Sequence, residues 1–522
     1  MDIKNQIKAI FTLAVFGLLF CACGEHQDGH ADGMEKHGET HEHGVVDFPI
    51  SCNDRAQEKF EMGLGHLHHM MYDDSRPFFK SAAEADPECA MAYWGLAMTY
   101  FQPLWHPTSY KDLELGKDAI QRAIELGGGT DREAGFIEAT KAFYTDPDPP
   151  AADRPGDHEA RVKAWKTAQR DLFEKYPDNV DAGAFYALAE VCYAMTQFSP
   201  HVERDYSREL LAGEILEGLF EDHPDHPGLY HYLIHAYDSP KLAHKALEVS
   251  KEYDKLAPTT AHALHMPSHI FVRLGMWEET ADLNERSAEA ALNSPANGLT
   301  SLHYPHALDY MMYAYLQMND RENAKRTLQK VNDIDAVQNT FASAYGIAAA
   351  QARYYMELQK WEDAVELEIA NPGALDWDLY PGALALTSYA RGLGAARSGN
   401  IEVAEKEAGK INDYVQSMQD EGNYYWAHMS DALGKAVEAW ITFESGETEE
   451  ALKMIKNAAK MEESMDKHPI SPGEIFPVRE LYGEMLMKTG HTEEARVAFE
   501  TSLNRTPERR NALENIELLA EN

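Results

Sequence analysis

Basic residues are scarce in this 522-residue chain, which carries 47 Lys and Arg against 87 Asp and Glu and has a formal net charge of −40. A nucleic-acid-binding protein needs a basic face, and the sequence has no cluster of Lys and Arg that could supply one. We therefore expect no nucleic-acid partner. Cations, basic peptides or a well-solvated surface suit such an acidic chain better.

Cysteine is also scarce. The five cysteines are Cys21, Cys23, Cys52, Cys89 and Cys192, and no pair in the folded region has the spacing of a metal knuckle. Cys89 and Cys192 fall within helical patterns, where a free cysteine usually behaves as a small buried apolar residue. The sequence thus predicts no disulfide framework.

The usual local signatures of catalysis are missing. The chain has no Gly-rich phosphate loop, no Gly-x-Ser-x-Gly elbow and no local Cys/His dyad. Strand-like alternation of useful length is missing too, so the pattern predicts an all-α protein. We name no catalytic residue, and the sequence favours a binding function over an enzymatic one.

One apolar run, Ile10 to Phe20, lies close to the N-terminus and is followed by Cys-Ala-Cys-Gly. It is too short for a membrane-spanning helix and is typical of a secretory signal. Its end resembles a bacterial lipobox with Cys23 as the acceptor, although Phe20 stands where such motifs prefer Leu.

This pattern predicts a lipoprotein signal peptide over residues 1–22 and a lipidated N-terminus at Cys23. The expected location is the cell envelope, with the protein anchored in the outer membrane and facing the periplasm or the cell surface. The alternative is a plain secreted protein cut near Ala22.

Residues 23–52 are rich in Gly, His, Asp and Glu and lack a periodic apolar pattern, so we expect a disordered tether. The tether contains five histidines: His26, His30, His37, His41 and His43. An imidazole-rich tract can bind Zn²⁺ or Cu²⁺ loosely. The alternative is a hydrophilic spacer between lipid and domain.

From Ala56 onward, helical patterns recur at roughly 30–45 residues, which is typical of a helical solenoid. The clearest copies are residues 56–87 and 478–507, whose small and large apolar residues resemble the tetratricopeptide repeat (TPR). We predict an all-α, TPR-type solenoid of helical hairpins with a right-handed superhelix. It divides into an irregular N-terminal region (53–224), central His-rich repeats (225–340), and C-terminal repeats with a capping helix (341–522).

Histidines are concentrated in the central repeats. His231 and His235, and likewise His265 and His269, have the spacing that places two rings on one helix face. In TPR arrays the first helix of each repeat lines the concave surface. Aligning three consecutive repeats directs these residues toward one groove: His231, His235, His262, His265, His269, His306 and Asp309. Pro267 interrupts the second of these helices.

Such a cluster predicts transition-metal binding. Two neutral imidazoles from one helix and a third from the next could bind Zn²⁺ or Cu²⁺. The first pair lacks the Glu that zinc proteases use as a general base. The alternative is that the rings fill helix interfaces and bond to backbone or tyrosines. Secondary ligand candidates are His68, His69 and His106.

Three segments carry a family resemblance: CAMAYWGLAM (89–98), HYLIHAYD (231–238) and HALHMPSHIFVRLGMW (262–277). They resemble a group of bacterial TPR proteins and lipoproteins without an assigned activity, over most of the chain from Cys52 onward. The resemblance implies fold and export but no reaction.

Together these features predict an exported, lipid-anchored TPR scaffold. Its concave groove would bind a peptide, a protein or a small ligand, and it would contact the membrane only through the lipid. The alternatives are a Zn- or Cu-binding protein built on the histidine cluster and, third, a metal-dependent hydrolase on the same cluster.

Overall fold

The computed structural model describes residues 43–105, 107–145, 155–197, 199 and 204–521. The predicted signal peptide, Cys23 and most of the tether lie outside the described residues. The helices all belong to one compact unit, which spans residues 41–522. Within its described part the structure is helical throughout, with isolated β-bridges but no strand.

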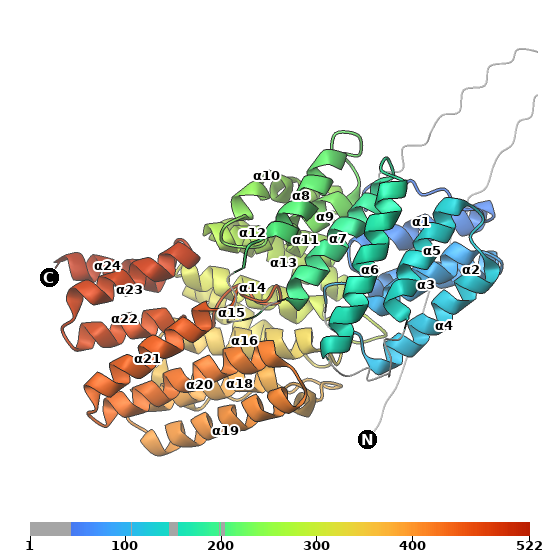
Figure 1. The fold of residues 1–522 in the computed structure, drawn as a ribbon. Coiled ribbons are helices and arrows are strands. Elements are labelled where there is room, and N and C mark those ends of the chain that lie inside the picture. Colours follow the sequence, from blue (N-terminus) through green and yellow to red (C-terminus); the bar gives the residue numbers. More distant parts are fainter. Residues whose placement is uncertain (1–42, 106, 146–154, 198, 200–203, 522) are drawn as a thin grey trace, which may run out of the picture. The chain divides into compact units, whose positions relative to one another are not determined.

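The N-terminal helices pack in sequence order, each against its predecessor (Figure 1). They are α1 (Asp54–His68), α2 (Tyr72–Ala85), α3 (Ala90–Phe101), α4 (Tyr110–Leu126), α5 (Asp131–Tyr144), α6 (Pro155–Lys175), α7 (Val180–Thr196) and α8 (Ser207–Leu219). Helices α4–α7 all lie in the region that the sequence predicted to be irregular (53–224).

The central helices follow the same pattern, and α9 also contacts α1 and α12. They are α9 (Pro227–Tyr237), the short η1 (Ala243–Lys245), α10 (Leu247–Leu256), α11 (Ala261–His265), α12 (Pro267–Leu274), α13 (Trp277–Asn293), α14 (His303–Gln317) and α15 (Arg321–Asn332). Pro267 ends α11 and occupies the first turn of α12, where its missing N–H is tolerated.

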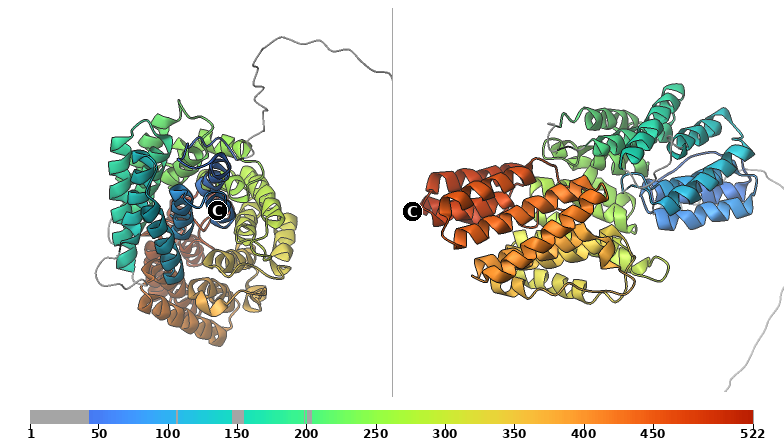
Figure 2. Two further views of the ribbon diagram at one scale, coloured as in Figure 1. Left: turned by 90° about the vertical axis from the view of Figure 1, so that its right-hand side faces the viewer. Right: turned by 60° about the horizontal axis from the view of Figure 1, so that its bottom comes forward.

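The C-terminal helices continue the stack, as both views in Figure 2 show. They are α16 (Phe341–Glu357), α17 (Trp361–Val365), η2 (Trp377–Leu379), α18 (Pro381–Arg397), α19 (Ile401–Asp420), α20 (Tyr424–Glu444), α21 (Thr448–Glu463), α22 (Val478–Lys488), α23 (Thr492–Arg505) and α24 (Arg510–Glu521). The prediction of an all-α, TPR-type solenoid of helical hairpins is confirmed, whereas the handedness of the superhelix stays a prediction.

The repeat signature in the sequence corresponds to close helix contacts. A Cβ added at Gly483 of α22 would lie 2.8 Å from the ring of Phe499 on α23. In the first repeat, the ring of Phe79 would lie 3.0 Å from a Cβ at Gly63 and 2.4 Å from one at Gly95. Gly490 turns the chain between α22 and α23 with a φ of +79°, a conformation that glycine adopts without strain.

The predicted end of the tether at residue 52 is wrong, because residues 43–52 pack against the helices. Phe48 is fully buried, with its ring centroid 5.4 Å from that of Phe60 and 5.0 Å from that of Phe136. Although the residues around Phe48 are largely polar, the segment packs against the helices because burying an aromatic ring stabilises the folded chain by roughly 1.5–3 kcal/mol.

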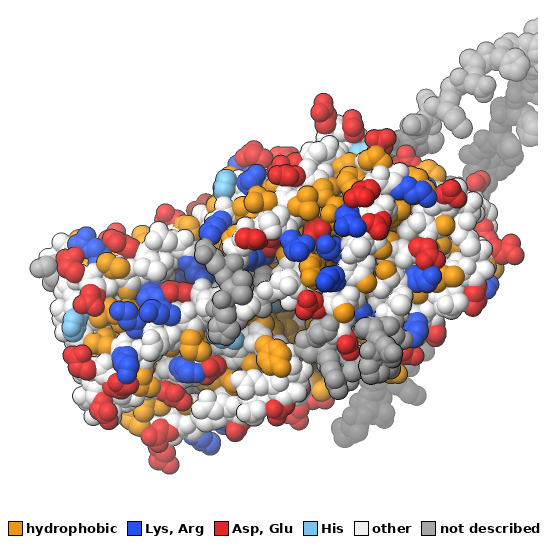
Figure 3. Space-filling model, viewed as in Figure 1, with side chains coloured by type: hydrophobic (Ala, Val, Ile, Leu, Met, Phe, Trp, Pro, Cys, Tyr) orange, Lys and Arg blue, Asp and Glu red, His pale blue; other side chains and the backbone are white. Residues whose placement is uncertain are grey.

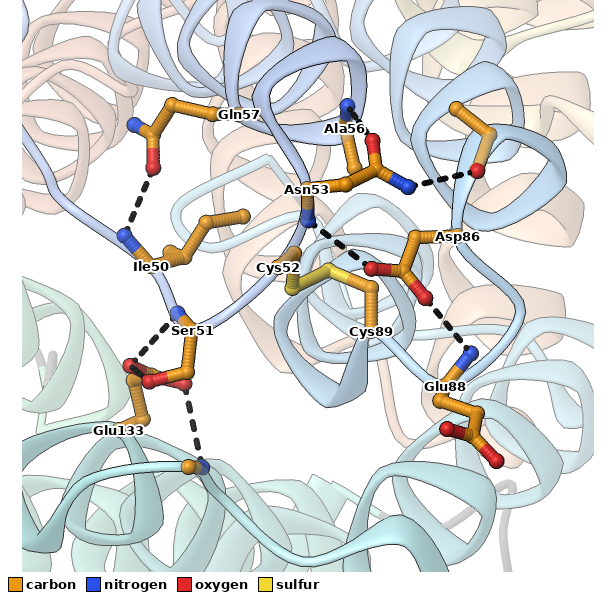
Figure 4. The surroundings of a disulfide bond; sticks show 12 residues. Ile50, Ser51, Cys52, Asn53, Ala56, Gln57, Asp86, Glu88, Cys89 and Glu133 are labelled. Atoms are coloured by element: carbon orange, nitrogen blue, oxygen red, sulfur yellow. Dashed lines mark hydrogen bonds between the residues drawn. A yellow bond between two sulfur atoms is a disulfide. The ribbon is translucent and has the colours of Figure 1, made fainter.

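The sequence predicted no disulfide framework and placed Cys89 within a helical pattern, but the described residues contain a disulfide. Cys52 is bonded to Cys89 (Figure 4). Cys89 does not lie inside a helix but at the N-cap of α3, next to the chain that leads into α1. Asn53, the next residue after Cys52, caps α1 by accepting from the N–H of Ala56, and its own N–H donates to Asp86. These bonds hold the two cysteines side by side.

Two apolar cores meet at the His-rich helices. One core draws on residues between Phe48 and Ile270, and the other on residues between Ala261 and Leu519. Helices α11 and α12 contribute to both, so the histidines lie where the two cores adjoin.

The surface is acidic but mixed. On the face in Figure 3, Lys and Arg are interspersed with Asp and Glu and form no basic patch. None of the helices in the described residues has the combined length and apolar character that spanning a bilayer requires.

Candidate metal centre

Seven buried or half-buried histidines from α9, α11, α12 and α14 form one continuous group, which we call the histidine layer. Its members are His231, His235, His262, His265, His269, His303 and His306. Ring contacts link all seven, with centroid separations from 4.3 to 5.9 Å. The structure therefore brings together all six histidines that the sequence directed at one groove.

Three of these residues, His265, His269 and His306, form what we call the first triad. One ligand atom from each lies within 4.8 Å of the others, and all three side chains are buried. His265 ends α11, His269 lies in the first turn of α12, and His306 lies on α14. The break at Pro267 therefore sits between two members of the triad.

The hydrogen bonds of His265 and His269 fix which nitrogen of each of these two rings carries the proton. His265 Nδ1 lies 2.7 Å from Asn284 Oδ1, and the amide nitrogen of Asn284 donates to Thr280 O. Since this amide oxygen can only accept, His265 Nδ1 is the donor. Nε2 of a neutral His265 then carries a lone pair.

The same logic applies to His269. Its Nδ1 lies 3.0 Å from Asp238 Oδ2 and donates to that carboxylate. Nε2 of His269 therefore also carries a lone pair, and it lies 3.0 Å from Nε2 of His265. Two lone pairs that face each other at this distance repel, unless a cation lies between them.

Asp238 is held in place as an anion. It accepts from Arg273 Nε at 2.8 Å and from Lys467 Nζ at 3.3 Å. Burial alone would raise the pKa of the Asp238 carboxyl, but Lys467 and Arg273 outweigh it and hold the pKa well below its usual range. A carboxylate behind a ligating histidine is the common arrangement in metal sites, where it orients the ring.

A second triad, His231, His235 and His262, lies against the first. Its ligand atoms also fall within 4.8 Å of one another. The ring centroid of His235 is 5.7 Å from that of His269, and the centroid of His262 is 5.9 Å from that of His265. His235 is half-buried, whereas the other two are buried.

Burial keeps the histidine layer uncharged near neutral pH. It lowers the pKa of His265 and His262 well below 6.5, and neighbouring histidines lower both further. The pKa of His235 falls to about 3 and that of His303 to about 4, in both cases chiefly through burial. Neutral imidazole is the form that binds metal.

The groove predicted from the repeat register is closed. Tyr310 of α14 lies over the first triad, with its ring centroid 4.5 Å from that of His265. Its hydroxyl donates to Pro469 O, in the loop between α21 and α22. The same loop carries Lys467, so a segment remote in sequence covers the histidine layer.

Asp309, the one carboxylate in the predicted set, does not join the metal group. Its Oδ1 accepts from Arg353 Nε at 2.7 Å, and both side chains are fully buried. Arg353 lies on α16, one hairpin further along the chain, and its guanidinium forms an ion pair with the Asp309 carboxylate. Asp309 is therefore a structural ion-pair partner.

The secondary candidates are explained by ordinary hydrogen bonds. His69 Nδ1 bonds Tyr253 Oη at 2.7 Å, and His68 Nδ1 bonds Tyr232 Oη at 3.0 Å. His68 Nε2 also lies 2.9 Å from Asp181 Oδ1, so both of its nitrogens are partnered. His106 lies outside the described residues.

Another group that contains a carboxylate was missed by sequence reasoning. Asp181 Oδ1 lies between His68 Nε2 at 2.9 Å and His226 Nε2 at 3.4 Å, and all three residues are buried. Since Asp181 Oδ1 contacts one nitrogen of each imidazole, this cluster is a buried hydrogen-bonded group, in which Asp181 Oδ2 and His226 Nδ1 have no partner among the described residues.

Three residues that support the histidine layer were also missed. His303 precedes His306 by three residues, so helical spacing could have placed it on the same face. Asp238 follows His235 by three residues and offered a similar signal. Asn284 lies on α13 and offered none, because only the fold brings it to His265.

Comparisons with known proteins add little. No family model matches the chain, and no curated protein matches it. Among solved structures, human IFIT1, in a dimer with m7Gppp-AAAA, matches at 13% identity and a TM-score of 0.34. The match covers 78% of this chain and 82% of that one. At this level the likeness carries no argument about function.

Proposed function

We propose that this protein binds a divalent transition-metal ion, Zn²⁺ or Cu²⁺, at His265, His269 and His306. The observation that carries this proposal is the 3.0 Å separation of Nε2 of His265 and Nε2 of His269. Each of these rings carries its proton on Nδ1, so both Nε2 atoms have a lone pair. Tetrahedral Zn²⁺ with Zn–N bonds of roughly 2.0–2.1 Å would hold two such nitrogens roughly 3.3 Å apart.

The third ligand supports the same assignment. His306 is buried beside His265, with ring centroids 4.3 Å apart, and its Nδ1 has no hydrogen-bond partner in the described part of the chain. An unpaired buried nitrogen destabilises a fold by about 1–3 kcal/mol. A metal ion bound by all three rings removes that penalty.

The donor set favours Zn²⁺ or Cu²⁺. Neutral imidazoles suit these ions, whereas Mg²⁺ and Ca²⁺ prefer oxygen ligands. The carboxylate that contacts the triad, Asp238, is engaged by His269, Arg273 and Lys467. It is therefore poorly placed to act as a general base, so metal binding is favoured over metal-dependent hydrolysis.

Export and lipid anchoring at Cys23, as in the TPR lipoproteins that the sequence resembles, are part of this proposal. The Cys52–Cys89 disulfide supports an oxidising compartment outside the cytoplasm. A metabolic label carried by a fatty acid should be incorporated into the wild-type chain and not into a Cys23→Ser variant. Incorporation into both would overturn the anchor.

Metal analysis of the full chain tests the central proposal. The four tether histidines outside the described residues should first be removed as His26→Asn, His30→Asn, His37→Asn and His41→Asn, so that loosely held ions do not contribute. After dialysis against Zn²⁺, this tether-substituted protein should retain tightly bound zinc.

Further substitution of His265→Ala and His269→Ala should abolish binding at the first triad. His306→Phe, which removes no hydrogen bond of Nδ1, serves as a gentler variant with the same expected loss. His244→Asn, at an exposed histidine, is the matched control and should leave zinc content unchanged. Full zinc retention in both triad variants would overturn the proposal.

A scaffold function that recruits a peptide or protein is the second candidate. Helices α15 to α17 border an open hollow of about 440 Å³ lined by Lys325, Gln329, Tyr354, Tyr355, Lys360 and Asp363. Aromatic and charged side chains of this kind suit a peptide. Binding of a defined peptide that is unchanged when the metal is removed, and lost in Tyr354→Ala, would favour this function.

We expect neither a nucleic-acid partner nor a membrane contact other than the lipid. The mixed, acidic surface supports this expectation. Salt-sensitive binding of single-stranded RNA or DNA by the purified protein would contradict it.

A further inference from the structure

The second triad, His231, His235 and His262, carries more unpaired nitrogen atoms than the first. Nε2 of His231, Nε2 of His235 and both ring nitrogens of His262 are buried and have no hydrogen-bond partner among the described residues. Each ring has one lone pair at least, and the three rings meet within 4.8 Å. This concentration of unsatisfied acceptors needs a physical explanation.

The tautomer of His231 is fixed. Its Nδ1 lies 2.7 Å from the carbonyl oxygen of His68, which can only accept, so Nδ1 carries the proton. Nε2 of His231 is then a lone pair in a buried site. A Lewis acid or a hydrogen-bond donor must face it.

The hydroxyls near this triad are already engaged. The ring centroid of Tyr253 lies 5.8 Å from that of His231, but its hydroxyl bonds His69. The ring of Tyr232 contacts His231 at 5.7 Å, and its hydroxyl bonds His68. Bonding to tyrosines, which explains His68 and His69, therefore does not explain the second triad.

We infer that His231, His235 and His262 bind a second divalent transition-metal ion beside the one at the first triad, which makes the histidine layer a two-metal centre. This inference rests on the proposed function. The two ions are neighbours because His235 contacts His269 and His262 contacts His265. With three imidazoles in each set, both positions take the same class of ion.

His235 is the member of the second triad that is partly exposed to solvent. It is the half-buried member of the two triads, whereas all three members of the first triad are buried. The second triad thus lies nearer to the solvent than the first.

Metal stoichiometry separates this inference from the proposed function. The tether-substituted full chain should bind two Zn²⁺ per protein at equilibrium. A His262→Phe substitution should reduce this to one, because the His262 nitrogens make no protein hydrogen bond within the described residues that the phenyl ring would break. The His265→Ala/His269→Ala protein should retain one ion, held at the second triad.

The outcomes are distinct. A single ion whose binding is unchanged by His262→Phe overturns the second site and leaves the first intact. A single ion lost with His262→Phe but kept in His265→Ala/His269→Ala overturns the first site and leaves the second. No tightly bound ion overturns both. His244→Asn should bind two ions, like the parent.

A measurement on the protein without triad substitutions guards against misfolded variants. Titration of the tether-substituted protein with Cu²⁺ should give an isolated Cu²⁺ electron paramagnetic resonance spectrum at one equivalent. At two equivalents, coupling between neighbouring ions should broaden that spectrum. Simple doubling of the intensity of the first spectrum would overturn a pair of adjacent ions.

Discussion

The histidine layer and the buried cluster around Arg509 are both deeply polar, yet they are satisfied to very different degrees. Arg509 donates from Nε and Nη2 to Glu480 at 2.9 and 3.0 Å and from Nη1 to Glu357 at 2.5 Å, with all three side chains fully buried. Every nitrogen of its guanidinium is therefore used. In the histidine layer, by contrast, lone pairs face each other.

This difference shows how a structural polar cluster can be told from a binding site. Opposite charges pair within the Arg509 cluster, and Ser502 and Asn511 add hydrogen bonds to Glu480, which leaves Glu357 Oε2 as the carboxylate oxygen of the cluster without a partner among the described residues. In the histidine layer, the Nδ1 protons of His231, His265 and His269 are donated to partners outside the layer, so the Nε2 atoms of these rings cannot donate to one another. In the function proposed above, a metal ion from outside the chain would complete it.

The largest expected effect concerns the satisfied cluster. Arg509→Met should lower the free energy of unfolding by about 3–5 kcal/mol, because it leaves Glu357 and Glu480 buried without their cation. Chemical denaturation of the metal-free protein measures this loss. Zinc stoichiometry in the folded variant should remain unchanged. A loss of zinc would contradict the assignment of the Arg509 cluster as purely structural.

Zn²⁺ should stabilise the folded protein only by binding to the histidine layer. At a free Zn²⁺ concentration about 1,000 times the Kd, the free energy of unfolding should rise by about 4 kcal/mol per site. Thermal unfolding with and without Zn²⁺ measures the shift. In the His265→Ala/His269→Ala protein the part due to the first triad should vanish, whereas Arg509→Met should retain all of it.

Acid should weaken the metal-free protein through the same histidines. The unfolded chain takes up protons near pH 6.5, but in the fold His235 and His303 stay neutral down to pH values of about 3 and 4, the values to which their pKa is lowered. Below pH 6.5 the unfolded state therefore binds more protons, and the free energy of unfolding falls by about 1.4 kcal/mol per pH unit for each such histidine.

Above pH 6.5 this contribution is complete and independent of pH. Denaturation between pH 7.5 and 5 should show this decline in the free energy of unfolding. In a His303→Phe variant, its slope against pH should be shallower by about 1.4 kcal/mol per pH unit, the contribution of one proton. Equal slopes for parent and variant would mean that His303 takes up its proton in the folded protein as readily as in the unfolded chain.

The smallest effect concerns the triad without metal. His306→Phe should raise the free energy of unfolding of the metal-free protein by about 1 kcal/mol, since it removes an unpaired nitrogen and keeps a planar ring. Denaturation in the presence of a chelator provides the value. A loss as large as that of Arg509→Met would show that His306 belongs to a closed structural cluster instead.

Much of the candidate site could be predicted from local spacing. The two pairs at i and i+4, together with the repeat register, directed His231, His265 and their partners toward one place, and the rings do meet there. Helical periodicity is a short-range property, so it is readable from one sequence.

The predictions were wrong where contacts between segments distant in sequence determine the structure. Arg353 of α16 captures Asp309, and the loop that carries Lys467 closes the expected groove. The disulfide depended on Cys89 lying at a helix cap beside Cys52, which requires the first hairpin to be formed. No local pattern encodes these contacts.

Diffraction from crystals grown with Zn²⁺, recorded on both sides of the zinc absorption edge, tests the central claim most directly. An anomalous peak is expected about 2.1 Å from Nε2 of both His265 and His269, with His306 as the third ligand. Zinc bound only at surface carboxylates, with no peak among these three rings, would contradict it.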